Sequence, residues 1–285
     1  MAEPATPYIF DNSDEREAER LAGIQAAWDA GTFRHLTDLG VGHGWRCLEV
    51  GAGAGSVARW LCERVGEKGS VLATDINTAL LDGLDFPNLE VRRHDIQSEE
   101  LPWGEFDLVH CRLVLMHLPA REEALARMAD ALAPGGWMLV EDVSFAGTGT
   151  ATRRGSATFR SLIVPLRAML RAHGADGRRL PVLFNRLGLT EVGAEGRVVV
   201  LVGGSEDNAW ALPTLERIQE RLTGGEGQEP SKVRAAFERV PALRRAAERQ
   251  LVRLRQLLDD PEFAFHCPAM VAAWGRRPVS PGSGR

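Results

Sequence analysis

The chain has 285 residues, 44% hydrophobic and 26% charged, which is enough apolar material for one large core or one core with an insertion. Its formal net charge of −5 disfavours non-specific binding to nucleic acid, which needs many basic contacts to phosphate, and no apolar run is long enough to span a membrane. Its four cysteines are scattered without a C-x-x-C pair, so we expect reduced thiols in a cytoplasmic protein and neither a disulfide framework nor a zinc site.

The N-terminal region predicts two helices. Residues 12–31 begin with capping side chains and carry apolar residues at the i, i+3 and i+7 spacing of one helical face. We expect Gly31 to end this helix, because glycine favours helix ends, and a second short helix to follow over 32–40.

From residue 45 onward, short apolar runs alternate with amphipathic segments. An alternation of strand and helix predicts a parallel sheet covered by helices on both faces. The predicted strands of this region are 45–50, 70–74, 89–93, 106–111 and 137–143.

The first strand leads into a glycine-rich turn, "CLEVGAGAGS", at residues 47–56. Glycine allows a ligand to approach the backbone, and the helix that follows offers free N–H donors at its start. The dinucleotide spacing G-x-G-x-x-G requires a glycine at position 56, where this chain has Ser56. The turn therefore indicates a nucleotide-like ligand other than a dinucleotide.

Acidic residues follow at the ends of the next two predicted strands. Asp75 ends the second strand, where it can accept hydrogen bonds from a ribose diol. Asp95 and Ile96 end the third, an acid suited to an exocyclic amino group beside an apolar surface for adenine. The glycine turn and the two acids follow three successive strands at equivalent positions. This pattern favours a nucleoside site over the alternative that the acids are solvated loop residues.

Five stretches together resemble the class I methyltransferases that use S-adenosylmethionine: "LEVGAGAGS", "ATDI", "HDI", "FDLVHCRLVLMHL" and "LAPGGWMLVED". The similarity is to the small-molecule branch, which includes quinone-pathway C-methyltransferases and natural-product enzymes. It covers residues 35–145, and more loosely 178–204 and 262–278. It implies an α/β, Rossmann-like, doubly wound sheet of seven strands in the order 3-2-1-4-5-7-6, with strand 7 antiparallel. Residues 190–204 would supply strand 6 and 267–274 strand 7.

The resemblance also implies the cofactor, S-adenosyl-L-methionine, with S-adenosyl-L-homocysteine as product and no metal. The turn would pass under the methionine part, Asp75 would hold the ribose and Asp95 the adenine amine. A tyrosine and an arginine near the N-terminus would fold over the cofactor, although a surface helix is the alternative for that segment. The implied cofactor-binding residues are Tyr8, Arg20, Glu49, Gly51, Ala52, Gly53, Gly55, Asp75, Ile76, Asp95, Ile96 and Cys111.

The substrate is expected at the carboxyl edge of the sheet, under long helical excursions of the chain. His110 could also face this pocket, but His117 and His266 are the predicted catalytic bases, with a structural position as the alternative. The predicted substrate-binding residues are Arg112 at the end of the fourth strand and the helical pair Arg167 and Arg171. These arginines would suit an anionic substrate, or else belong to a solvated surface.

We therefore expect a chain of seven parts. They are a helical lid (1–40), a cofactor-binding core (41–143), a cap segment (144–177), the core continued (178–204), a helical cap insertion (205–261), a final core strand (262–278) and a disordered tail (279–285).

These patterns predict an enzyme that moves a methyl group to an O, N or C atom of a small molecule by in-line displacement in a capped pocket. We expect no nucleic acid or membrane partner, and the cap helices are also candidates for a homodimer contact. Two alternatives stay open, an S-adenosylmethionine-binding enzyme that does not methylate, such as a cyclase or pericyclase, and a peptide or protein methyltransferase. Ser56 and Asp95 weigh against a dinucleotide oxidoreductase.

Overall fold

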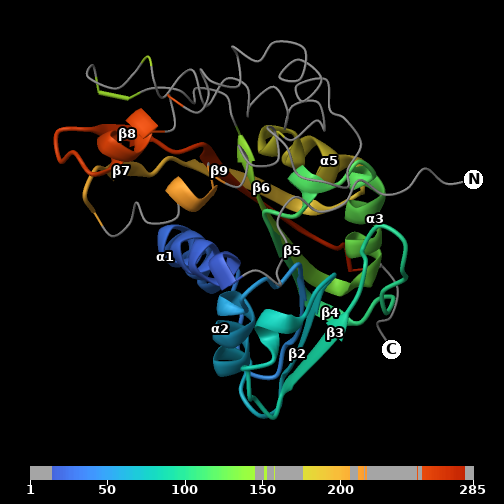
Figure 1. Cartoon of the computed structure of the whole chain (residues 1–285). Coiled ribbons are helices and arrows are strands. Elements are labelled where there is room, and N and C mark those ends of the chain that lie inside the picture. Colours follow the sequence, from blue (N-terminus) through green and yellow to red (C-terminus); the bar gives the residue numbers. More distant parts are fainter. Residues whose placement is uncertain are drawn as a thin grey trace, which may run out of the picture. The chain divides into compact units, whose positions relative to one another are not determined.

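The computed structural model describes residues 15–144, 151–152, 157, 176–205, 211–214, 216, 249 and 252–279 (Figure 1). The chain divides into two compact units. The larger, called the core unit below, comprises Trp28–Ser144, Ala175–Arg197 and Met270–Arg285; the second unit comprises Met1–Ala27, Phe145–Gly174 and Val198–Ala269.

A seven-stranded sheet with the order β3-β2-β1-β4-β5-β9-β6 forms the centre of the core unit (Figure 1). Strands β1 to β5 are parallel wherever neighbours pair, and β6 runs antiparallel to β9. This order confirms the predicted Rossmann-like fold class. The strands are β1 (Arg46–Val50), β2 (Ser70–Asp75), β3 (Leu89–Arg93), β4 (Phe106–Arg112), β5 (Leu132–Ser144), β6 (Thr190–Arg197) and β9 (Ala269–Arg276).

Helices cover both faces of this sheet, so the central strands are apolar on both sides. On one face, α2 (Ser56–Val65) and the end of α1 (Glu15–Asp38) pack in one hydrophobic cluster with buried strand residues such as Leu108. On the other, α3 (Arg121–Ala131) and α5 (Leu180–Arg186) pack in a second cluster that includes Phe184. Burial on both faces explains why the strands read as continuous apolar runs in the sequence.

The prediction that Gly31 ends the first helix is wrong, because α1 is continuous from Glu15 to Asp38. Gly31 instead lies where another side chain comes close: an added Cβ would be 2.5 Å from Cζ of Arg197. The Arg197 guanidinium lies over the Trp28 ring and donates a hydrogen bond of 3.1 Å to the Trp28 carbonyl. Glycine is therefore explained here by close packing rather than by helix termination.

The predicted sixth strand, 190–204, is divided in the structure. Its first part forms β6, and its last part forms β7 (Val200–Val202), which pairs with β8 (Ala264–His266) in a separate two-stranded sheet. Consequently, the predicted base His266 ends β8 and lies outside the main sheet. Pro268, which has no N–H donor, lies between β8 and β9 and is unsuited to a continuous ladder.

The second unit contains the small β7–β8 sheet and a local core around Phe263 and Phe265, whose rings stack with centroids 5.6 Å apart. Its part of α1 carries a buried ion pair between Arg20 and Glu17 at 2.5 Å. The finer division of the chain into seven parts stays a prediction. Within the described ranges, none of the helices has the length and apolar character needed to cross a bilayer.

Candidate cofactor site

The glycine turn joins β1 to α2 at the carboxyl edge of the sheet. Gly51, Gly53 and Gly55 all have positive φ, at 72°, 56° and 77°. The amides of Gly51 and Ala52 both donate to the carbonyl of Thr74 on the neighbouring strand, at 2.8 and 3.0 Å. Glycine adopts these φ values without the steric cost that other residues incur, so the turn has a well-defined conformation.

The protein's own packing also requires two of these glycines. A Cβ at Gly51 would overlap Cγ2 of Val114, and one at Gly55 would lie 2.5 Å from Cδ1 of Leu84. The sequence-based interpretation gave ligand approach as the reason for these glycines. The structure adds a second reason that is independent of any ligand.

Asp75, at the end of β2, is held directly against this turn. Its carboxylate accepts hydrogen bonds from the amides of Gly53 (2.9 Å) and Asn77 (3.0 Å). Burial raises the pKa of Asp75, and the backbone donors partly oppose that shift. Each carboxylate oxygen can accept further hydrogen bonds, and the adjacent Ile76 side chain is 41% exposed. Asp75 and Ile76 therefore offer a polar and an apolar surface beside each other at the turn.

The end of β3 is arranged differently. Asp95 is half-buried and closes a local turn by accepting hydrogen bonds from the Gln97 amide (2.9 Å) and the Ser98 hydroxyl (3.1 Å). Ile96 is only 5% exposed and packs within the hydrophobic cluster on the α3 face. Of the two isoleucines expected to enclose an adenine ring, Ile76 is thus exposed and Ile96 belongs to the core.

Two other predicted cofactor residues are buried. Cys111 is fully buried in β4, and burial raises the pKa of its thiol well above the usual value, so the side chain is protonated and unreactive. Glu49, two residues before the turn, is 2% exposed and accepts a hydrogen bond of 2.6 Å from Nδ1 of His110.

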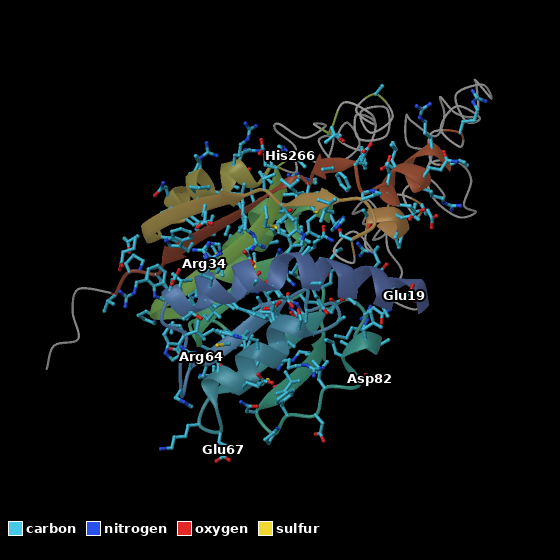
Figure 2. The ribbon with its side chains drawn as sticks, turned by 90° about the vertical axis from the view of Figure 1, so that its left-hand side faces the viewer. Glu19, Arg34, Arg64, Glu67, Asp82 and His266 are labelled. Carbon is cyan, nitrogen blue, oxygen red and sulfur yellow. The ribbon has the colours of Figure 1, made fainter. Side chains whose placement is uncertain are left out.

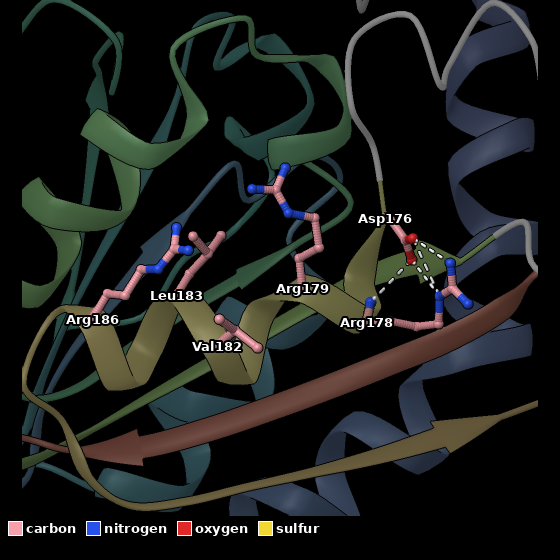
Figure 3. A pocket seen from close by; sticks show the side chains of 6 residues that line it. All are labelled: Asp176, Arg178, Arg179, Val182, Leu183 and Arg186. Atoms are coloured by element: carbon pink, nitrogen blue, oxygen red, sulfur yellow. Dashed lines mark hydrogen bonds and ion pairs between the residues drawn. The ribbon is translucent and has the colours of Figure 1, made fainter.

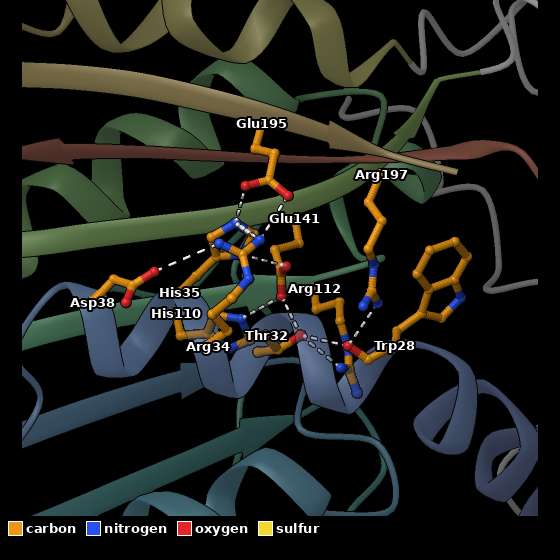
Figure 4. Close-up of polar contacts among 10 residues, drawn as sticks. All are labelled: Trp28, Thr32, Arg34, His35, Asp38, His110, Arg112, Glu141, Glu195 and Arg197. Carbon is orange, nitrogen blue, oxygen red and sulfur yellow. Dashed lines mark hydrogen bonds and ion pairs between the residues drawn. The ribbon is translucent and has the colours of Figure 1, made fainter. Parts of the chain in front are cut away.

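His110 contacts two carboxylates on neighbouring strands, and Figure 4 shows it with one of them, Glu141. Its Nδ1 contacts Glu49 on β1, and its Nε2 lies 3.4 Å from Oε2 of Glu141 on β5. Although burial disfavours the charged ring, the two carboxylates raise the pKa of His110 to about 9. Burial likewise opposes the charge on Glu141, but His110 and the nearby His35 hold the pKa of that carboxyl below its usual range. The ring is therefore an imidazolium at neutral pH.

The predicted substrate residue Arg112 contacts α1. Its guanidinium pairs with Asp29 at 2.8 Å and donates to the Thr32 hydroxyl at 2.9 Å, leaving 9% of the side chain exposed. Asp29 also accepts a hydrogen bond of 3.0 Å from the hydroxyl of Ser56, the first residue of α2. Ser56, which stands where the dinucleotide motif requires glycine, thus has a defined contact in the fold.

The remaining predicted residues are placed as follows. His117 is half-buried in the short helix η2 (Leu115–His117), which follows the carboxyl end of β4 in the core unit. His266 is exposed and lies in the second unit, as does Arg20. Tyr8, Arg167 and Arg171 lie outside the described residues.

Two adjacent buried acids on β5, Glu141 and Asp142, had not been singled out from the sequence. Asp142, on β5, is 4% exposed, and burial raises its pKa to about 7 despite a hydrogen bond of 2.8 Å from the Val143 amide. The signal that could have identified it is a pair of acids inside an otherwise apolar strand, "WMLVEDV". In the parts of the chain that the structure describes, no group of three or more His, Cys, Asp or Glu side chains is arranged to hold a metal ion.

A separate pocket of about 350 Å³ lies along α5 (Figure 3). An ion pair of 2.6 Å between Arg178 and Asp176 lies at one end of it. The lining residues are Asp176, Arg178, Arg179, Val182, Leu183 and Arg186, none of which was predicted as a site residue.

Comparison with known proteins shows which proteins the region of this site is similar to. Residues 48–138 match the family model described as a methyltransferase domain. The methyltransferase str2 of Strobilurus tenacellus is 32% identical over 168 residues, which are 58% of this chain and 59% of that protein. The ubiquinone/menaquinone biosynthesis C-methyltransferase UbiE of Laribacter hongkongensis is 31% identical over 163 residues, 54% of this chain and 64% of that protein. The matches thus span less than two thirds of these relatives.

Solved structures agree on the fold. The YcgJ protein of Bacillus subtilis superposes with a TM-score of 0.51 at 15% identity, covering 86% of this chain and 97% of that one. A phosphoethanolamine N-methyltransferase of Haemonchus contortus gives a TM-score of 0.51 at 16% identity, covering 88% and 53%. The match over residues 48–138, together with the sheet order and the glycine turn, thus makes this part of the chain similar to methyltransferase domains in both sequence and fold.

Proposed function

We propose that this protein transfers a methyl group from S-adenosylmethionine to a small-molecule acceptor. The observation that carries the proposal is the contact between Asp75 and the Gly53 amide, which joins the end of β2 to the glycine turn after β1. This contact sets a carboxylate, a glycine-rich turn and an exposed apolar side chain, Ile76, at one edge of a parallel sheet. Ligands bind at that edge in open α/β folds.

The residues present fit the cofactor. Asp75 is already oriented by backbone donors and would hold the ribose hydroxyls, while Ile76 would cover one face of the adenine. The turn and the start of α2 would lie along the methionine part, where a side chain at any of the three glycines would be strained. Of the residues first predicted, Asp95 and Glu49 have a weaker case, because their side chains are engaged locally. Cys111 is proposed through its backbone carbonyl, and burial of its thiol does not bear on that role.

When bound, the cofactor supplies an electrophilic methyl group, so the chain's main contribution is to hold the acceptor in line and to exclude water. His117, beside the carboxyl end of β4, is the proposed base for an acceptor that must lose a proton. A role for His266, and an anion contact for Arg167 and Arg171, stay predictions. UbiE is named as a ubiquinone/menaquinone biosynthesis C-methyltransferase, which supports a small-molecule acceptor, and the acceptor atom stays open among O, N and C.

Calorimetry tests the proposal through Asp75. We expect S-adenosylmethionine and S-adenosylhomocysteine to bind the wild type while NAD does not. Asp75→Ala should weaken binding by about 1.5–3 kcal/mol, the scale of hydrogen bonds to a charged group. Asp82, exposed after β2 and labelled in Figure 2, gives the matched control Asp82→Ala, which should bind like the wild type.

Two results would contradict different parts of the proposal. If the wild type binds neither S-adenosylmethionine nor S-adenosylhomocysteine, the proposed cofactor is wrong. If Asp75→Ala keeps full affinity, only the proposed role of Asp75 is wrong. Incubation with a metabolite library should then give a product heavier by one CH₂ group, detected by mass spectrometry. Cofactor binding with turnover but no such product would support the non-methylating alternative.

A further inference from the structure

The part of α1 that begins at Trp28 makes polar contacts that lead to both sides of the glycine turn, and Figure 4 shows those that reach Glu141. After the turn, the hydroxyl of Ser56 donates to Asp29 on α1. Before the turn, Glu49 is linked to α1 through buried side chains on two neighbouring strands. The turn is therefore bracketed by contacts that lead to the same helix.

The link before the turn runs across three adjacent strands. Glu49 on β1 pairs with His110 on β4, and His110 approaches Glu141 on β5. Glu141 accepts a hydrogen bond of 2.5 Å from the hydroxyl of Thr32 on α1, and Nδ1 of His35, also on α1, lies 3.5 Å from it. Each step of the path is a direct contact between buried side chains.

Arg112 connects the two sides. Its guanidinium contacts both Asp29, the partner of Ser56, and Thr32, the partner of Glu141. Thr32 therefore donates to a carboxylate and accepts from a guanidinium at the same time. Its side chain is fully buried, so no water replaces either partner if the hydroxyl is removed.

Burial makes this arrangement costly to disturb. Glu49, His110 and Glu141 have side-chain exposures between 0% and 3%. Buried charges are tolerated only when they are paired and hydrogen-bonded, and the loss of one partner leaves the others buried without compensation. The two carboxylates are balanced here by the imidazolium and by the nearby Arg112, so the set holds one arrangement of α1, β1, β4 and β5.

We propose that these residues form a positioning network through which α1 fixes the glycine turn for cofactor binding. The network, named here the α1 network, consists of Asp29, Thr32, Glu49, Ser56, His110, Arg112 and Glu141. Its members act through the turn and need not touch the cofactor or the reacting atoms. The ligand rests on the proposed function, whereas the bracketing of the turn is a property of the fold alone. A turn held in its binding conformation before the ligand arrives binds more tightly, because less ordering is needed on binding.

Thr32→Val is the central variant, since it keeps the shape of the side chain and removes the hydroxyl that joins Glu141 to Arg112. Thr37→Val is its matched control, because Thr37 is exposed on the same helix and its hydroxyl donates to the Phe33 carbonyl, outside the α1 network. Thr32→Ser restores the hydroxyl and serves as the rescue. Ser56→Ala tests the other side of the turn independently.

Amide hydrogen exchange without ligand is the first readout. The amides of Gly51, Ala52 and Gly53 are bonded to Thr74 and Asp75, so their exchange reports the closure of the turn. We expect faster exchange at these amides in Thr32→Val and Ser56→Ala, and wild-type rates in Thr37→Val and Thr32→Ser. If the network only stabilised the fold, the variants would have a lower melting temperature, and exchange would not be specifically faster at these three amides.

Affinity for S-adenosylhomocysteine, at a temperature where every variant is folded, is the second readout. We expect Kd to rise roughly two- to tenfold in Thr32→Val and in Ser56→Ala, the scale of one lost hydrogen bond. If the wild type does not bind S-adenosylhomocysteine, the proposed function is wrong. The exchange rates still test whether the α1 network fixes the glycine turn. Unchanged turn exchange in both variants overturns the proposal, and if Thr32→Val does not fold, Ser56→Ala alone decides it.

Discussion

At the scale of single residues, the glycine turn shows how packing and backbone conformation act together. Gly51 has a φ of 72°, and a side chain there would overlap Val114. Gly44 has a similar φ of 83°, but an added Cβ would have open space around it. The two glycines thus separate the backbone cost of a side chain from its steric cost.

We predict that Gly51→Ala destabilises the core unit more than Gly44→Ala does. Gly44→Ala should cost about 1–2 kcal/mol, the cost of a left-handed conformation for an L-residue. Gly51→Ala should cost a further 1–3 kcal/mol or so, because Val114 must move. Denaturant unfolding of both variants measures the difference.

Val114→Ala supplies the control for that comparison. It removes the Cγ2 atom that the new methyl group would meet, so adding it to Gly51→Ala should recover part of the lost stability. Equal costs for Gly51→Ala and Gly44→Ala, or no recovery in the double variant, would show that packing against Val114 is unimportant.

At the scale of elements, α1 continues through a residue that commonly ends helices. Gly31 is accommodated in mid-helix because the guanidinium of Arg197, from β6, occupies the place of a side chain. There it stacks on Trp28 and donates to the Trp28 carbonyl. The contact ties the helix to the edge strand of the sheet.

We predict that Gly31→Ala changes the free energy of unfolding by different amounts in two backgrounds. Alanine is a better helix former than glycine by about 1 kcal/mol, and that gain should appear in full when Arg197→Ala is already present. In the wild type the new methyl group displaces the guanidinium, so the gain should be offset by the lost contact with Trp28. A double-mutant cycle from denaturant unfolding measures the coupling, and additive effects would refute it.

At the scale of the whole molecule, buried titratable groups in the core unit set the pH dependence of stability. The raised pKa of Asp142, about 7, means that the folded state keeps a proton which the unfolded chain releases near its ordinary value of 3.8. Between these values the folded state binds more protons, so the free energy of unfolding falls as pH rises. The raised pKa of His110, about 9 against 6.5, gives a contribution that is complete below pH 6.5 and is lost as pH rises through 9.

We predict that Asp142→Asn becomes more stable than the wild type as pH rises. The two proteins should differ least at the lowest pH, because the unfolded carboxyl group takes up its proton as pH falls toward the ordinary pKa value of 3.8. The gap should widen up to about pH 7 and stay constant above it, since the variant never buries a carboxylate. Denaturant unfolding from pH 4 to 9 measures this, and a gap that does not change with pH would show that Asp142 is ionised in the folded protein.

The decline above pH 6.5 should persist in Asp142→Asn, because His110 is unchanged in that variant. Its imidazole resonances, followed by NMR, should titrate near pH 9. This separates the two groups within one series of measurements.

Much of the core could be predicted from the sequence. The five parallel strands, the order of the seven-stranded sheet and the turn at Gly51–Gly55 all follow from local patterns or from the family resemblance that they carry. These features depend on residues close together in the chain, where the alternation of apolar runs and the need for positive φ leave direct traces. The contact of Asp75 with the turn also follows, since both lie at the ends of neighbouring parallel strands.

The tertiary structure decided the features that join distant residues. Thr32 and Glu141 are 109 positions apart, Arg112 and Asp29 are 83 apart, and Arg197 meets Trp28 across 169 positions. These contacts turned Arg112 and His110 from pocket candidates into parts of a buried network, and kept α1 continuous at Gly31. From the sequence alone, a charged residue such as Arg112 could belong to a solvated surface, a pocket wall or a buried ion pair. Only its burial and its partners distinguish these cases, because the free energy of a charge depends on what surrounds it.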